Sequence, residues 1–78
     1  MLLEIITPEK KVFEGKVKSI LLPGTSGKFE ILNNHAPIIS TLNAGQVRVI
    51  NNSDQKELID INGGVIEMQN NKIIVLAD

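Results

Sequence analysis

The stretch from position 24 to 37, GTSGKFEILNNHAP, holds the only histidine of the chain, His35. An imidazole titrates near neutral pH and can act as a general base. A base needs a nucleophile or an orienting group close by, and only Glu30 and Ser40 are near it in sequence. The residues therefore favour a structural or partner-contacting role for His35 over catalysis.

The first half of this stretch, Gly24 to Lys28, superficially resembles a phosphate-binding loop. That motif requires glycine at position 22, Ser or Thr at position 29, and a helix behind it. Leu22 and Phe29 occupy those positions, and a predicted strand follows. A glycine turn between two strands is the better interpretation.

The remaining polar residues do not form a recognisable catalytic or metal site. The chain has no cysteine, which excludes disulfides and Cys-based zinc sites. Asp54, Glu57, Asp60 and Glu67 are spread along strands and a loop tip, whereas paired-carboxylate chemistry needs two groups held close together. We therefore expect a solvated acidic surface, with no catalytic residue, metal or cofactor.

Composition indicates one small globular domain covering residues 1–78. Apolar residues make up 42% of the 78 residues and aromatic residues only 3%, so the core must be aliphatic. A net charge of -1 offers no field to attract nucleic acid or anionic lipid. No signal peptide or membrane-spanning run is evident, so the sequence predicts a soluble, cytosolic domain.

Short β-branched runs separated by Gly, Asn and Pro predict an all-β fold. The expected architecture is an antiparallel β-sandwich or flattened barrel of about 8–10 short strands. Asn70 and Asn71 separate two apolar runs and predict a two-residue type I′ hairpin. The predicted strands are 2–7, 11–13, 16–22, 28–32, 38–42, 46–51, 56–61, 64–69 and 72–77.

Several predicted strands carry apolar residues on both faces. The runs 2–6, 20–22, 38–39 and 73–76 do not alternate with polar residues, unlike Val47-Arg48-Val49. Either a partner covers their outer side chains, or these segments lie at corners where the two sheets curl over one another.

The chain resembles the epsilon subunit of the rotary F-type ATP synthase over its whole length. The segments that carry the resemblance are LEIITPE (3–9), VFEG (12–15), LPGTSG (22–27), NHAP (34–37) with STL (40–42), NGG (62–64) and IVLAD (74–78). This resemblance implies an N-terminal β-sandwich in the rotor, bound to the gamma subunit and resting on the ring of c subunits.

As part of that rotor, the chain would help to couple proton-driven rotation to ATP synthesis on other subunits. It would be non-catalytic itself and would lie at the cytoplasmic face of the bacterial inner membrane. The resemblance places Lys28 and Glu30 toward the c ring, and Thr7, His35 and Ser40 toward gamma.

The chain departs from the family pattern at several positions. Glu30 stands where members usually carry glycine, Asn33 where they carry proline, and Lys28 where an acidic residue is common. Members also continue into a C-terminal helical hairpin that can inhibit ATP hydrolysis. This hairpin is absent from the 78 residues, which we expect to lack that inhibition.

Two alternatives to a rotor subunit belong to other classes of protein. A free-standing ligand- or peptide-binding β-sandwich would usually present aromatic platforms, but Phe13 and Phe29 are the only aromatic residues. A small hydrolase using His35 would lose its turnover in His35→Ala with the fold intact.

Overall fold

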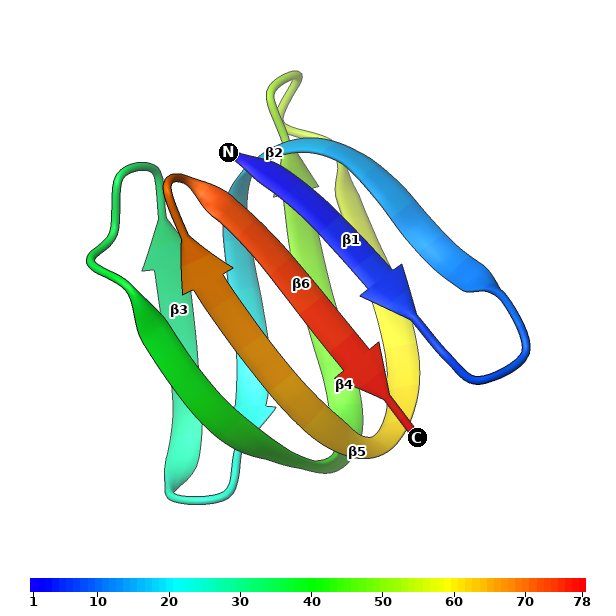
Figure 1. Ribbon diagram of the computed structural model, residues 1–78. Helices are drawn as coiled ribbons and strands as arrows, with labels where there is room; N and C mark the ends of the chain where they lie inside the picture. Colours follow the sequence, from blue (N-terminus) through cyan, green and yellow to red (C-terminus); the bar gives the residue numbers. More distant parts are fainter.

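The computed structural model describes residues 1–78 and contains six β-strands and no helix, which confirms the predicted all-β class (Figure 1). The strands are β1 (Leu2–Ile6), β2 (Lys11–Gly24), β3 (Gly27–Leu32), β4 (Ile38–Asn51), β5 (Lys56–Gln69) and β6 (Lys72–Ala77). They form one continuous sheet in the order β1-β6-β5-β4-β2-β3, and an additional pairing of β1 with β2 closes it into a flattened barrel.

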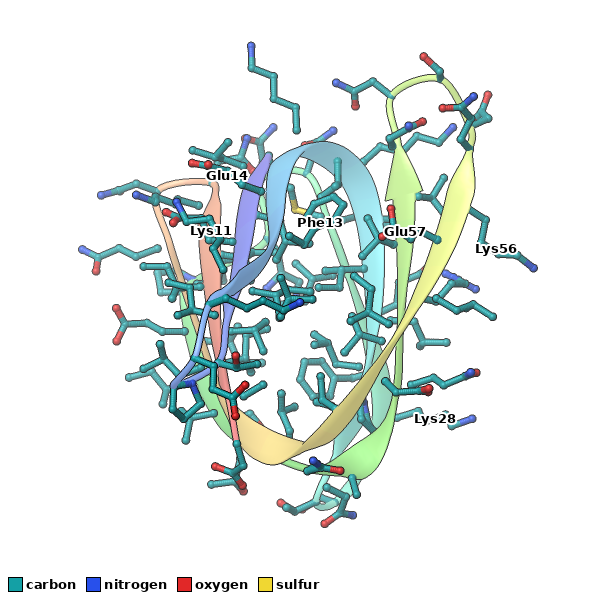
Figure 2. The ribbon with its side chains drawn as sticks, turned by 90° about the vertical axis from the view of Figure 1, so that its right-hand side faces the viewer. Lys11, Phe13, Glu14, Lys28, Lys56 and Glu57 are labelled. Atoms are coloured by element: carbon teal, nitrogen blue, oxygen red, sulfur yellow. The ribbon has the colours of Figure 1, made fainter.

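The flattened barrel has two layers, seen edge-on in Figure 2 with aliphatic side chains between them. We define the first layer as β1, β6 and the segments of β2, β4 and β5 that continue it, which are 11–16, 38–42 and 64–69. The second layer contains β3 and the remaining segments 17–24, 46–51 and 56–61. Three strands therefore pass from one layer to the other.

The predicted number of strands was wrong, because each of these three crossing strands was counted as two. β2, β4 and β5 are 14 residues long and bend without breaking. Clusters of Asn and Gly at 43–45 and 62–64 are typical of loops. Here β4 and β5 bend together and stay paired, with Leu42 opposite Gly64 and Ala44 opposite Asn62.

The predicted antiparallel architecture is confirmed, and it contains one parallel pair. Five of the six pairings are antiparallel, whereas β1 and β6 run parallel. The two strands come from opposite ends of the chain and are not joined by a hairpin, so no short turn forces them to be antiparallel. Their pairing brings the first and last strands side by side (Figure 1).

The core is aliphatic, as composition predicts. Side chains at alternate positions of the strands meet between the layers, and the polar groups between them face outward. The predicted type I′ hairpin is confirmed, since Asn70 and Asn71 have φ of 54° and 60° and Gln69 pairs with Lys72. The 16 buried apolar residues are Leu3, Ile5, Val17, Ile20, Leu22, Ile31, Leu42, Val47, Val49, Ile59, Ile61, Ile66, Met68, Ile73, Val75 and Ala77.

An ion-pair cluster ties together the three strands that close the barrel. Lys11 Nζ of β2 lies 3.1 Å from Glu4 Oε2 of β1 and 3.2 Å from Glu14 Oε1. Lys72 Nζ of β6 lies 3.5 Å from Glu4 Oε1. The Lys11 ammonium above all, followed by Lys72, holds the pKa of Glu4 below its ordinary value of 4.5. The hydrogen bond to Glu4 in turn raises the pKa of Lys11.

Replacing Gly64 by alanine should destabilise the fold by about 3 kcal/mol or more. Gly64 has φ of 148°, and a Cβ at this position would lie 2.2 Å from the Leu76 carbonyl oxygen of the neighbouring strand. Urea unfolding followed by circular dichroism measures the loss. Gly15→Ala is the control, because its Cβ would make only ordinary contacts, and equal stability of the two variants would contradict this account.

The ion-pair cluster predicts a loss of stability in acid. A carboxyl whose pKa is lowered in the folded state stabilises the fold above its unfolded pKa, and this contribution disappears as pH falls through the folded value. For Glu4 the loss therefore begins near pH 4.5 and continues below it. Urea unfolding at a series of pH values should show a shallower decline below pH 4.5 in Glu4→Gln, and parallel curves would rule out this contribution.

Candidate partner-binding surface

The outward side of the first layer carries a continuous row of aliphatic side chains. Val65 of β5 lies opposite Leu76 of β6, which lies opposite Ile6 of β1. In the neighbouring row, Ile39 of β4 and Ile74 of β6 lie on either side of Glu67 of β5. We call Ile6, Ile39, Val65, Ile74 and Leu76 the apolar face.

Strand alternation places the apolar face outside the core. The intervening residues Ile66 and Val75 are fully buried, so their neighbours must point to the other side of the sheet. Ile39, Leu76 and Val65 expose 73%, 55% and 40% of their surface. Contiguous exposed apolar groups of this kind are typical of interaction sites. The sequence-based expectation of outward aliphatic residues in the runs 38–39 and 73–76 is thus confirmed.

The opposite, outward side of the second layer is organised by a polar network. Glu30 Oε2 of β3 accepts a 2.6 Å hydrogen bond from Ser19 Oγ of β2 and a 2.5 Å bond from an Arg48 guanidinium nitrogen of β4. The Ser19 hydroxyl first, and the Arg48 guanidinium with it, hold the pKa of Glu30 below its ordinary value. The network ties the edge strand β3 to β2 beside it and to β4 beyond β2.

Lys28 lies near the tip of the β2–β3 hairpin, in the second layer, and its side chain projects outward (Figure 2). It is exposed and forms no ion pair within the chain, whereas Glu30 on the same face of β3 is engaged by Ser19 and Arg48. The hairpin tip is anchored to β4, because Thr25 N donates to the Thr41 carbonyl at 3.1 Å. Lys28 is therefore an unneutralised charge on a fixed support.

The three residues expected toward gamma lie apart from one another. Thr7 follows β1, where its hydroxyl donates to the Lys10 carbonyl at 3.1 Å. Ser40 lies in β4, at the other side of the first layer. His35 lies in the loop between β3 and β4, and the neighbouring Asn34 amide donates to the Asn71 side chain at 2.8 Å. The structure therefore does not join the three residues into one cluster, and Ser40, which lies opposite the buried Ile66, is on the inward side of β4.

The imidazole of His35 makes a local contact. Its Nδ1 lies 2.7 Å from the Ala36 carbonyl oxygen, and no carboxylate forms an ion pair with it. His35 also lines none of the four surface hollows of the molecule. The geometry supplies neither a nucleophile nor an orienting group for a base at this position.

No group of three or more His, Cys, Asp or Glu side chains is placed to hold a metal ion. None of the secondary-structure elements is a helix capable of crossing a bilayer.

Sequence reasoning missed the particular position of Glu67. From the sequence it is expected, with Asp54, Glu57 and Asp60, on a solvated acidic surface. The four carboxylates do lie apart, but Glu67 alone stands among the aliphatic side chains of the apolar face. The sequence does contain a signal for this position, because a two-residue turn at Asn70-Asn71 sets Glu67 opposite Ile74.

A family model and individual relatives point to the same protein family. The family described as ATP synthase, Delta/Epsilon chain, beta-sandwich domain matches residues 1–78. The ATP synthase epsilon chain of Campylobacter hominis is 44% identical to this chain, and the match covers all of this chain and 61% of the relative. That of Dichelobacter nodosus is 40% identical, with 95% of this chain matching 52% of the relative. The chain therefore spans a little over half the length of these two relatives.

Solved structures show the same fold. A chain in the OSCP/F1/c-ring structure of the Euglena gracilis mitochondrial ATP synthase aligns with a TM-score of 0.93 at 16% identity, covering 99% of this chain and 49% of that one. A chain in the central stalk/c-ring structure of the Tetrahymena thermophila mitochondrial ATP synthase aligns with a TM-score of 0.81 at 19% identity, covering 99% of this chain and 62% of that one. With the family match over all 78 residues, the chain belongs to the β-sandwich family of ATP synthase delta/epsilon chains.

Proposed function

We propose that this chain forms the β-sandwich of an epsilon subunit in the rotor of an F-type ATP synthase. It binds the gamma subunit and the ring of c subunits, and it helps to couple proton-driven rotation to ATP synthesis at catalytic sites on other chains. It has no catalytic role of its own. It reaches the cytoplasmic face of the bacterial inner membrane only through the assembled complex.

The observation that carries this proposal is the apolar face of the first layer. Five aliphatic side chains from four strands lie together on the outside of a domain with a complete core of its own. Covering such a surface gains about 25 cal/mol per Å² of apolar area removed from water. A protein interface of standard size buries about 800 Å² on each partner, and this chain has 4686 Å² of accessible surface in total. One such interface would cover a large share of a domain this small.

The positions of the expected contact residues are consistent with two partners on different sides. We assign the apolar face to gamma, together with Thr7 after β1, His35 in the β3–β4 loop and Ser40 beside Ile39 in β4. Lys28 and Glu30 lie on the outward side of the second layer, at the β2–β3 hairpin, which we assign to the c ring. Because Glu30 is bonded to Ser19 and Arg48, the free charge offered to the ring is that of Lys28.

The gamma contact predicts that Ile39→Asp weakens binding at least tenfold, equivalent to about 1.4 kcal/mol, because a carboxylate would be placed in an apolar interface. The measurement is calorimetric titration of the chain into the catalytic head of the synthase, stripped of its own epsilon subunit. Leu58→Asp is the matched control, since Leu58 is 51% exposed but lies in the second layer. Equal weakening by both substitutions, or no binding of the unaltered chain, would contradict the assignment.

The ring contact predicts a smaller effect of charge. Lys28→Glu should weaken attachment of the head–epsilon complex to membranes that contain the c ring by about fivefold, because exposed ion pairs contribute at most about 1 kcal/mol. Co-sedimentation with such membranes measures it. Lys16→Glu, an exposed lysine in the β2 segment paired with β1, is the control. The ring assignment fails if both variants attach as the unaltered chain does.

A further inference from the structure

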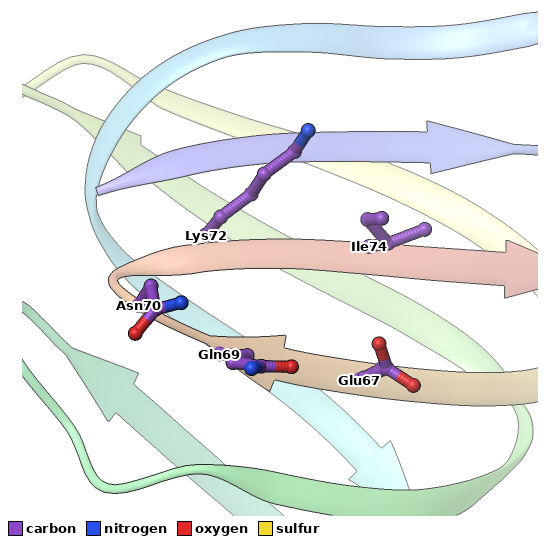
Figure 3. A pocket seen from close by; sticks show the side chains of 5 residues that line it. All are labelled: Glu67, Gln69, Asn70, Lys72 and Ile74. Atoms are coloured by element: carbon purple, nitrogen blue, oxygen red, sulfur yellow. The ribbon is translucent and has the colours of Figure 1, made fainter.

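Glu67 is the one carboxylate set within the apolar face. Across the strands it lies between Ile39 and Ile74, and Val65 precedes it by two residues on the same side of β5. Its side chain lines three of the four surface hollows, including one of about 370 Å³ at the β5–β6 hairpin (Figure 3). It forms no ion pair within the chain.

The nearest cation on this side of the sheet is directed elsewhere. Lys72 lies diagonally across the β5–β6 pair from Glu67, within reach of a long side chain. Its ammonium is instead 3.5 Å from Glu4, and Figure 3 shows the Lys72 side chain extending toward β1 and away from Glu67. Glu4 is also paired with Lys11, so the charges at this margin are mutually neutralised. In the first-layer part of this hairpin, residues 64–77, the outward charges are Glu67 and Lys72, and Glu67 is the one without a partner.

The solvation free energy of the unpaired Glu67 carboxylate differs between the free chain and a complex in which a partner covers the apolar face. In the free chain, water solvates Glu67, because the residue is exposed. When another protein covers the surrounding aliphatic groups, it removes that water, and an unpaired buried charge carries a large desolvation cost. A wholly apolar partner would therefore be rejected at this point. A partner that brings a cation to Glu67 would recover hydrogen bonds and charge attraction.

We infer that the protein surface covering the apolar face carries a lysine or arginine that pairs with Glu67, surrounded by apolar side chains. This inference rests on the proposed function, which assigns the surface to the gamma subunit. The ion pair fixes the register of gamma on the sheet, since aliphatic contacts alone permit sliding along the strands. Glu67 is thus the specificity-determining residue of an interface whose affinity comes from its apolar neighbours.

The test is calorimetric titration of Glu67 variants into the epsilon-stripped catalytic head. Glu67→Lys should weaken binding at least 100-fold, because two cations would meet in a covered interface. Glu67→Gln, which keeps the shape and removes the charge, should weaken it about 10- to 100-fold. Asp60→Lys and Asp60→Asn are the matched controls, since Asp60 is an exposed carboxylate on the same strand in the second layer, and they should bind as the unaltered chain does.

A second measurement identifies the cation. Each Lys and Arg of gamma is changed in turn to Glu, and one of these variants should restore binding to Glu67→Lys. If Glu67→Gln binds as tightly as the unaltered chain or more tightly, or if no gamma variant restores binding, the ion pair is disproved while the proposed function stands. If the unaltered chain does not bind the head at all, both the proposed function and the ion pair are disproved.

Discussion

The architecture depends on three long strands, β2, β4 and β5, that bend from one layer to the other without ending. β4 and β5 cross together, and Gly64 lies at their crossing, opposite Leu42 of β4 and Ala77 of β6. Its φ of 148° and the 2.2 Å approach that a Cβ would make to the Leu76 carbonyl leave room for glycine alone. Because the strands cross between layers, a chain of 78 residues can form a closed two-layer structure. Within the first layer, β1, β5 and β6 then have no free edge.

Closure of the barrel also explains why the apolar face exists. The inward positions of the first-layer strands fill the core, and their outward positions contribute nothing to it. Aliphatic residues at outward positions such as Ile39 and Leu76 therefore add no packing to the isolated fold. Their side chains become useful only when another protein surface removes them from water, which is the physical basis of the proposed rotor function.

The charged residues divide into those that stabilise the fold and those left free. Glu4 and Glu30 are each held by neighbouring cations or hydroxyls, and both have lowered pKa values. Lys28 and Glu67 have no such partners and lie on opposite layers. Under the proposed function the two partners lie on different sides, so Lys28 and Glu67 would each face a different neighbour.

The predictions from sequence succeeded where local chemistry decides the outcome. The Asn70-Asn71 hairpin followed from the tolerance of asparagine for positive φ, and the aliphatic core followed from composition. They failed where two distant segments cooperate. The Asn and Gly residues at 43–45 and 62–64 look like separate loops in the sequence, and only their mutual pairing keeps both strands continuous.

The sequence by itself determined the all-β class, the composition of the core, the turn chemistry and a family resemblance that extends over the whole chain. Tertiary structure alone decided that β1 and β6 run parallel, that Lys72 turns to Glu4, and that Glu67 stands unpaired among Ile39, Val65 and Ile74. The physical reason is that the alternation along one strand determines only which side of the sheet a residue faces. Its neighbours on that side come from other strands, and their identity depends on register and closure.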